Sequence, residues 1–350
     1  MSEDLAIPEE PLPVSVLTGF LGSGKTTVLR HLLACPGMDE TAVVINEFGE
    51  IGLDHLLVES AKEDMVLLNS GCLCCSVRGD LVDTLRRLFT KRVRREIPPF
   101  ARLLVETTGL ADPAPILHTL MNDPLLVTHF RLDGVIATVD GVVGGATLDQ
   151  HAEALKQAAV ADRVLITKGD IAPPEAIEDL EARLRQLNPA APILAIRDGR
   201  VKPGQLFNAG LYDPETKTLE VRRWLKAEAY GEAHHHGHSH DVNRHDDRIR
   251  AFCLTAEQPL DWDRFNAWVE MLTTIHGENI LRLKGLLDIA QIERPVAIHG
   301  VQHVFHPPLL LEAWPDEDRR SRLVIIARDL NRETVERSFQ EFNRDGSVIS

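Results

Sequence analysis

The sequence predicts an α/β protein, in which a parallel sheet with helices on both faces precedes a small α+β domain. Over the first two thirds of the chain, apolar runs of strand length alternate with helical patterns, which is typical of such a sheet. A glycine-rich loop joins the first strand to the first helix, so a ligand should lie beyond the carboxyl ends of the strands. Residues 227–247 have little apolar content and are predicted to link residues 1–226 to residues 248–350.

Composition narrows the classes of function. The 350 residues suffice for about two domains, and 44% of them are hydrophobic. The formal net charge of −15 argues against nucleic acid and anionic membranes as partners. No apolar run approaches the ~20 residues that span a bilayer. The acidic, proline-rich start of the chain is unlike a signal peptide, and the clustered cysteines suit a reducing compartment. We therefore expect a cytoplasmic protein.

The first element is a strand at residues 13–18, followed by a G-x4-G-K-T loop and a helical pattern at residues 27–33. In this context the motif indicates a phosphate-binding loop, and a glycine-rich turn with an incidental lysine is the weaker interpretation. Its N–H groups and the helix N-terminus attract phosphate oxygens. Lys25 should reach the β- and γ-phosphates, and the Thr26 hydroxyl should bind Mg²⁺. The predicted phosphate-binding residues are Gly19, Gly22, Ser23, Gly24, Lys25, Thr26 and Thr27.

A buried strand at residues 41–45 runs into an acidic, glycine-punctuated stretch at residues 46–54. P-loop GTPases place their first switch segment at this point of the chain. Glu47, Glu50 and Asp54 are therefore candidates to ligate a metal or orient a water molecule. Solvation of a surface loop is an equally good interpretation for any one of these carboxylates.

A short strand at residues 65–68 leads into a predicted loop with the sequence G-C-L-C-C, and a helix is predicted at residues 77–90. Thiolates are soft ligands that favour Zn²⁺ or Cu⁺. Cys72 and Cys74 are two positions apart and should face the same side, and Cys75 lies near a helix start, which lowers a thiol pKa. The three sulfurs leave a tetrahedral ion one ligand short. A thiol redox pair or buried cysteines are the alternatives, and the clustering favours metal.

The strand at residues 102–106 ends in Glu106, the position from which an acidic residue holds Mg²⁺ in P-loop proteins. Gly109, three residues later, resembles the glycine whose N–H meets the γ-phosphate. A glutamate that ends a strand by chance is the alternative, which the upstream phosphate loop disfavours.

Further strands at residues 132–140 and 163–166 flank a helix at residues 152–159, and the second strand ends in Thr167-Lys168-Gly169-Asp170. This turn resembles the guanine-binding pattern N-K-x-D. Asp170 would accept hydrogen bonds from N1–H and the 2-amino group of guanine, whereas adenine would leave the carboxylate unpaired. The Lys168 stem can cover the base. The motif therefore favours GTP over ATP, and a helix at residues 175–187 and a strand at residues 192–196 complete this region.

Residues 227–247 carry a run of histidines whose imidazoles suit Zn²⁺, Ni²⁺, Co²⁺ or Cu²⁺. A flexible run of this kind should collect metal weakly, and a solvated linker with incidental histidines is the alternative. The predicted antenna residues are His234, His235, His236, His238 and His240.

The last third predicts a strand at residues 250–254, a helix at residues 261–276, three strands and a helix at residues 331–342. The strands are expected at residues 280–283, 295–311 (broken in two) and 323–326. His299, His303 and His306 are interpreted as core or surface residues, because lone histidines in strands are seldom ligands.

Together these motifs resemble the CobW-like metallochaperone GTPases, relatives of the HypB and UreG nickel-insertion GTPases. The carboxyl third is similar to the CobW C-terminal domain, notably at residues 277–285 and 322–328. The resemblance implies GTP hydrolysis coupled to delivery of a divalent metal, most often zinc and in one branch cobalt, to a client metalloprotein. It also implies catalysis by Lys25, Thr26 and Glu106, and it makes Glu47 a candidate fourth donor beside the cysteines.

The sequence leads to the hypothesis of a GTP-dependent chaperone with Zn²⁺ as the first candidate cargo. A cobalt chaperone for cobalamin synthesis, a metal buffer with incidental nucleotide binding, and a P-loop kinase are the alternatives. The T-K-x-D turn argues against a kinase, and the phosphate loop argues against a passive buffer. The client, the residue that positions the hydrolytic water and the oligomeric state (a homo-oligomer included) stay open.

Overall fold

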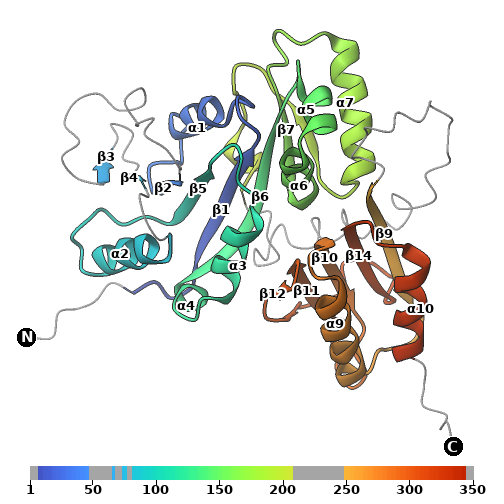
Figure 1. Ribbon diagram of the computed structural model, residues 1–350. Coiled ribbons are helices and arrows are strands. Elements are labelled where there is room, and N and C mark those ends of the chain that lie inside the picture. The colour runs from blue at the N-terminus through green and yellow to red at the C-terminus, as the bar shows by residue number, and fades with distance from the viewer. Residues whose placement is uncertain (1–6, 47–64, 68–72, 77–80, 208–247, 344–350) are drawn as a thin grey trace, which may run out of the picture.

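The computed structural model describes residues 7–46, 65–67, 73–76, 81–207 and 248–343. These residues form two sheets, with the C-terminal strands and helices beneath the first sheet (Figure 1). The prediction of a parallel sheet followed by a smaller α+β domain is confirmed.

The first sheet has the strand order β3-β4-β2-β5-β1-β6-β7-β8. All neighbouring strands pair in parallel except β3, which is antiparallel to β4. Its strands are β1 (Leu12–Gly19), β2 (Thr41–Asn46), β3 (Met65–Leu67), β4 (Leu73–Ser76), β5 (Arg102–Thr107), β6 (Phe130–Asp140), β7 (Arg163–Thr167) and β8 (Ile193–Ala195).

Helices cover both faces of this sheet because alternate strand residues point to opposite sides. Leu17 and Leu104 belong to a core with α1 and residues 196–207, whereas Val16 and Val105 belong to a core with α2, α3, α4 and α6. The helices are α1 (Lys25–Leu33), α2 (Leu81–Val93), α3 (Ala114–Asn122), α4 (Leu126–His129), α5 (Gly144–Gln150), α6 (Ala152–Val160), α7 (Pro174–Leu187) and the 3-10 helix η2 (Pro203–Gln205).

The second sheet is antiparallel, with the order β12-β11-β10-β14-β9 and β13 beside β11. Its outer face packs on α9 and α10, where the Trp268 and Phe339 rings meet at 4.9 Å. The elements are β9 (Ile249–Ala256), α9 (Trp262–His276), β10 (Ile280–Leu287), β11 (Val296–Val301), β12 (Val304–Phe305), β13 (Leu309–Leu310), β14 (Ser321–Arg328) and α10 (Arg332–Asn343).

Two predictions about strands need correction. Residues 295–311 form three strands, since Gln302 adopts a φ of 54° at one break and the pair Pro307-Pro308 lacks N–H donors at the other. The prediction that Cys74 and Cys75 lie in a loop is also wrong. They belong to β4, a strand of four residues whose strand character comes from pairing with β2 on one side and β3 on the other. The turn-like local sequence does not reveal it.

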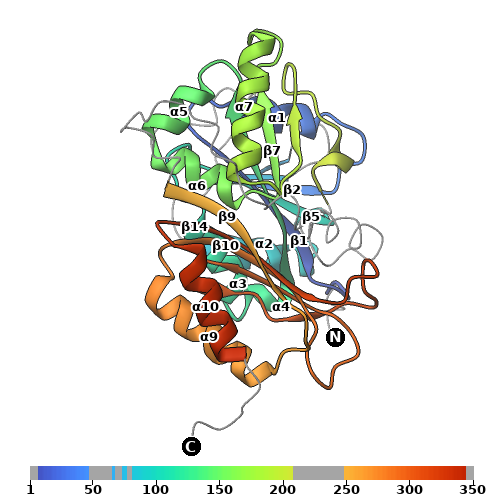
Figure 2. The same ribbon diagram turned by 90° about the vertical axis from the view of Figure 1, so that its right-hand side faces the viewer.

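The inner face of the second sheet packs against α3, α6 and α7 of the first part of the chain. Figure 2 shows β9, β10 and β14 between α6 on one side and α9 and α10 on the other. Leu281, Val301 and Ile326 join the same apolar core as α3 and α6. The two sheets are therefore held together by a shared core. Among the described residues, no helix is long and apolar enough to cross a membrane.

Cys253 on β9 lies outside the cysteine motif and yields a test of the C-terminal core. Its side chain is 9% exposed, and burial raises the pKa of its thiol to about 11. Because the thiolate is the nucleophile, only about 0.1% of this thiol is reactive at pH 8. We expect iodoacetamide at that pH to leave Cys253 unmodified in the native protein and to modify it in urea, as read by peptide mass spectrometry. The half-buried Cys35 is the internal control. Equal alkylation rates for the two cysteines would contradict the buried placement.

Candidate functional site

The phosphate loop is built by glycines between β1 and α1. Gly19, Gly22 and Gly24 have φ values of 144°, 71° and 89°, which side chains disfavour. The loop closes through a hydrogen bond from Ser23 N to Phe20 O of 3.2 Å. Its curvature follows from the sequence, since only glycine tolerates these backbone angles at low cost.

Lys25 begins α1 and is 9% exposed. Its Nζ donates to the carbonyl oxygens of Gly19, at 2.8 Å, and Phe20, at 3.1 Å. The ammonium group therefore lies over the loop, next to the backbone that the motif uses to surround phosphate.

Buried hydroxyl groups fix the loop to the strands beneath it. Ser23 Oγ lies 2.6 Å from Thr138 Oγ1 on β6, and Thr167 Oγ1 on β7 donates to Ser23 O at 2.8 Å. Thr167 stands where the guanine pattern has Asn, and its hydroxyl holds the phosphate loop in place. This contact connects the T-K-x-D turn to the phosphate loop.

Thr26 and Glu106 meet at the end of β5. Thr26 Oγ1 donates to Glu106 Oε1 at 3.2 Å, and the Glu106 side chain is 6% exposed. A hydroxyl and a carboxylate are the hard oxygen donors that Mg²⁺ prefers, so this corner fits that ion. Gly109 is also close to the loop, because a Cβ added to it would lie 2.7 Å from Leu21 N. The structure therefore brings together the phosphate loop, the strand-end acid and Gly109.

The T-K-x-D turn follows β7 at the same edge of the sheet. Lys168 has a φ of 59° and forms an ion pair with Asp140, which is largely buried at the end of β6. Asp140 Oδ1 also accepts from the N–H groups of Val142, at 2.8 Å, and Val143, at 3.2 Å. Asp170 Oδ1 accepts from Asp198 N at 3.3 Å.

Asp140 is a site residue that the sequence reasoning missed. It fixes both the Lys168 ammonium group and the loop after β6. An acidic residue at the end of a predicted strand, at the edge where other motifs gather, was the available signal. The prediction of a strand at residues 132–140 includes Asp140 only as its last residue.

Cys74 and Cys75 of the cysteine motif lie on β4, two strands away from β5. Cys75 pairs with Val44 of β2, and Val44 pairs with Val105, the residue before Glu106. With neighbouring strands about 4.8 Å apart, the β4 backbone is about 10 Å from that of β5 at this level.

Other predicted metal ligands cannot be placed. Cys72 and Glu47 lie outside the described residues, as do the five antenna histidines from His234 to His240. Within the described part of the chain, no three His, Cys, Asp or Glu side chains cluster to hold a metal ion.

The fold and the arrangement of the loop, Glu106 and the T-K-x-D turn are those of a P-loop GTPase-type nucleotide-binding protein. Residues 13–195 match the family model described as CobW/HypB/UreG, nucleotide-binding domain, and residues 249–343 match the cobalamin synthesis protein cobW C-terminal domain. The chain belongs to this CobW family, as its motifs predicted.

Several known proteins are similar to this chain over almost its whole length. The zinc chaperone YjiA of Escherichia coli is 33% identical, covering 94% of this chain and 98% of the relative. The zinc-regulated GTPase metalloprotein activator 1 of Schizosaccharomyces pombe is 28% identical, covering 92% and 84%. The crystal structure of the Zn(II)-bound YjiA GTPase has a TM-score of 0.72 and 31% identity, over 96% of this chain and 100% of that one. The two chains therefore share the fold that the described residues form.

Gly19 provides a test of the loop geometry. A Cβ at this position would lie 2.2 Å from Thr138 Oγ1 and 2.5 Å from Thr138 O, at a φ that side chains disfavour. We expect Gly19→Ala to displace the loop from β6, with a strain of about 1–3 kcal/mol, and to weaken guanine nucleotide binding at least about tenfold. Fluorescent nucleotide titration and thermal melting measure the two effects.

Gly145→Ala is the matched control, because nothing lies within 4 Å of the added Cβ in α5. It should bind nucleotide like the native protein. If Gly19→Ala bound nucleotide with the affinity of the native protein, nucleotide binding would not depend on the loop geometry at Gly19.

Proposed function

We propose that this protein is a GTP-hydrolysing metallochaperone, which binds a divalent ion at its cysteine motif and transfers it to a client protein. The carrying observation is the sheet register that sets Cys75, Val44 and Val105 side by side, with Glu106 and the phosphate loop next to them. The printed names of the relatives, zinc chaperones and zinc-regulated GTPases, support the proposal and make Zn²⁺ the first candidate cargo.

In this proposal the phosphates lie in the loop formed by residues 19–27, with the N–H groups facing their oxygens. The Lys25 ammonium exchanges its carbonyl partners for the β- and γ-phosphates. Thr26 Oγ1 and Glu106 hold Mg²⁺, which when bound neutralises charge on the phosphate oxygens. Gly109 offers its N–H to the γ-phosphate, so the segment after β5 responds to whether that phosphate is present.

Guanine specificity is assigned to the turn after β7. Asp170 accepts from N1–H and the 2-amino group of guanine, and it is too poor a partner for adenine, which has an acceptor at N1. The ion pair with Asp140 holds the Lys168 stem, which covers the base. This arrangement supports GTP over ATP.

The metal site is assigned to Cys72, Cys74 and Cys75, with Glu47 as the fourth donor. Glu47 follows the last residue of β2, and β2 is the strand between β4 and β5. The ion would then contact the ends of β2 and β4, and the γ-phosphate would contact the segment after β5, the strand next to β2. Residues 227–247, with the histidines, act as a weak antenna between the nucleotide-binding part, residues 1–226, and the client-docking part, residues 248–350.

GTP turnover with and without metal tests the activity and its cargo together. We expect Zn²⁺ to change the rate of GTP turnover by the native protein, and we expect Co²⁺ to change this rate by a smaller factor. Cys74→Ala should abolish the metal effect while retaining basal turnover, because the substitution removes a thiolate and leaves the phosphate loop intact. Cys35→Ala, which removes a thiol outside the motif, should behave like the native protein. Metal-independent turnover in all three proteins would rule out the cysteine motif as the regulating site.

Coupling between the two sites requires different metal affinities in the two nucleotide states. A ratio of about tenfold corresponds to about 1.4 kcal/mol of coupling free energy. We expect competition titrations of Zn²⁺ to show at least that ratio between the GTP-analogue and GDP forms. Lys25→Ala, which loses the phosphate contact, should show the same affinity in both. Equal affinities in the native protein would reject coupling and leave a metal buffer that binds nucleotide.

A further inference from the structure

Helix α6 holds the segment that follows β5. Residues 109–112, here called the sensor segment, begin at Gly109, which approaches the phosphate loop. Gln157 of α6 is 1% exposed, and its Nε2 donates to Gly109 O at 3.3 Å and to Ala111 O at 2.9 Å. The neighbouring Lys156 donates to Asp112 Oδ2 at 2.7 Å. The Gln157 side-chain amide therefore donates both of its hydrogen bonds to backbone carbonyls of the sensor segment.

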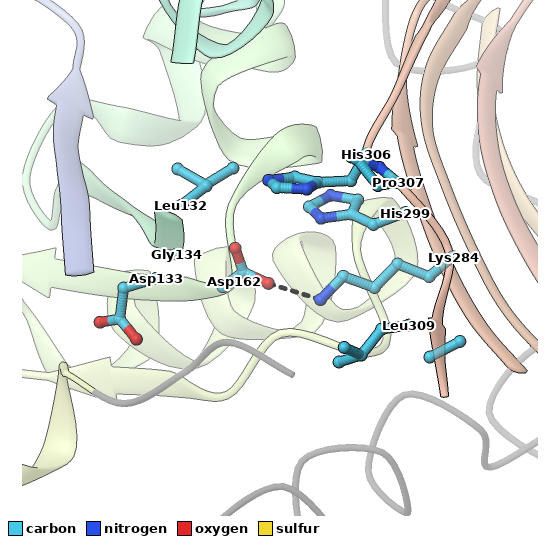
Figure 3. Close-up of a pocket in the computed structure, with 10 residues that line it drawn as sticks. Leu132, Asp133, Gly134, Asp162, Lys284, His299, His306, Pro307 and Leu309 are labelled. Atoms are coloured by element: carbon cyan, nitrogen blue, oxygen red, sulfur yellow. Dashed lines mark hydrogen bonds and ion pairs between the residues drawn. The ribbon is translucent and has the colours of Figure 1, made fainter. Parts of the chain in front are cut away.

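The last turn of α6 is held by the C-terminal domain. Arg282 of β10 donates through Nη1 to Val160 O at 2.9 Å and also to Ala161 O, and it forms an ion pair with Asp162. Lys284 Nζ donates to the same carboxylate at 2.7 Å. Figure 3 shows Asp162 facing Lys284 across the junction between the two parts of the chain.

The charged side chains at this junction are buried, so each of them needs a partner of opposite charge at close range. Asp162, Arg282 and Lys284 are 7%, 6% and 8% exposed. Burial disfavours the Asp162 carboxylate, but the two cations outweigh it and hold the pKa of that carboxyl well below its usual range. His299, beside His306 in Figure 3, has its pKa lowered by burial and by the same cations, so it stays neutral at pH 7. Separating such a pair leaves an uncompensated charge, so the contacts at this end of α6 tend to move as a unit.

The two sets of contacts lie one turn apart on a well-packed helix, because Gln157 is only three residues before Val160. The nine residues of α6 span about 13 Å, and six of them are buried. Asn188 fixes its last turn through hydrogen bonds to Ala158 O, at 3.0 Å, and Ala161 O, at 2.8 Å. A packed helix of this length moves as a rigid body. Movement of the sensor segment against Gln157 is therefore transmitted to Arg282, one turn further along the helix.

We propose that Gln157 is a positioning residue for the sensor segment, and that α6 couples this segment to the C-terminal domain through Arg282. The inference rests on the proposed GTP-dependent function and adds the route by which the nucleotide state reaches the client-docking part. Coupling free energies are reciprocal, so a client bound to the C-terminal domain changes the preference for GTP over GDP by the same factor.

A second contact runs in parallel through α3, the helix that directly follows the sensor segment. His118 donates through Nε2 to Val301 O of β11 at 2.9 Å, and its ring meets that of His303 at 4.7 Å. One helix that follows the sensor segment, α3, and one that contacts it, α6, thus both bind the second sheet. The docking of that sheet depends on the conformation of residues 109–112 through both.

The experiment compares two buried arginines with acidic partners. Arg282 pairs with Asp162 across the junction, whereas Arg322, 5% exposed, pairs with Asp316 inside the C-terminal domain. Arg282→Met and Arg322→Met should both lower the melting temperature. The decisive readout is the ratio of affinities for a non-hydrolysable GTP analogue and for GDP, which a general loss of stability would leave unchanged.

We expect Arg282→Met and Gln157→Met each to change this ratio by about fivefold or more, the lower end of ordinary allosteric coupling, and Arg322→Met to leave it unchanged. The double variant should change the ratio no more than the larger single change, since both remove one pathway. Arg282→Lys, which keeps the charge beside Asp162 but loses the forked contact to the two carbonyls, should shift the ratio in the same direction. Arg282→Lys also keeps the test possible if Arg282→Met does not fold.

The results separate the two levels of the proposal. Native protein that binds neither the analogue nor GDP would overturn the proposed function itself. Native binding with an unchanged ratio in Arg282→Met and Arg282→Lys would overturn the coupling through α6 and leave the GTPase proposal standing. An equal change in Arg322→Met would also overturn it, since any disturbance of the C-terminal domain would then have the same effect.

Discussion

The parallel pairing of β1 with β5 and β6 is the constraint on which the site depends. The register aligns Leu17 with Glu106 on one side and Gly19 with Thr138 on the other. Parallel strands end at the same edge, so the loop after β1, the acid at the end of β5 and the hydroxyl that supports the loop arrive together. A shift of one residue would turn each of these side chains to the opposite face. The chemistry of the site is therefore a consequence of backbone pairing.

The two edges of the first sheet are stabilised in different ways. At the carboxyl edge, hydroxyl groups and backbone carbonyls fix the phosphate loop to β6 and β7, as in the hydrogen bond from Thr167 to Ser23. Such neutral bonds are individually modest and can rearrange when a charged ligand enters. At the amino end of β7, Asp162 forms ion pairs with Arg282 and Lys284 of the second sheet. These ion pairs fix the second sheet to the first. The protein thus combines an adaptable ligand edge with a rigid junction, and α6 connects them.

Much of this organisation could be predicted from local sequence. The phosphate loop, Glu106 and the T-K-x-D turn are short motifs whose neighbours in the chain define their structure, and the structure brings them to one edge. Features that depend on distant pairing could not be predicted. β4 looks like a loop because its four residues form a strand only through pairing on both sides, with the distant β2 and with β3. The role of Gln157 appears only when α6 is packed beside residues 109–112. The buried Arg282 and Lys284 look like ordinary surface cations of an alternating strand until Asp162 faces them.

The central place of β1 also has a consequence during synthesis of the chain. This strand, which ends at Gly19, is made well before its neighbours β5 and β6, which begin at Arg102 and Phe130. At a translation rate of about 5–20 residues per second, β1 waits roughly 5–30 s on the ribosome before both of its edges can be paired. During that interval its apolar run resembles an open edge strand, to which other chains can add. Nascent molecules therefore depend on early shielding of residues 12–19, long before any nucleotide can be bound.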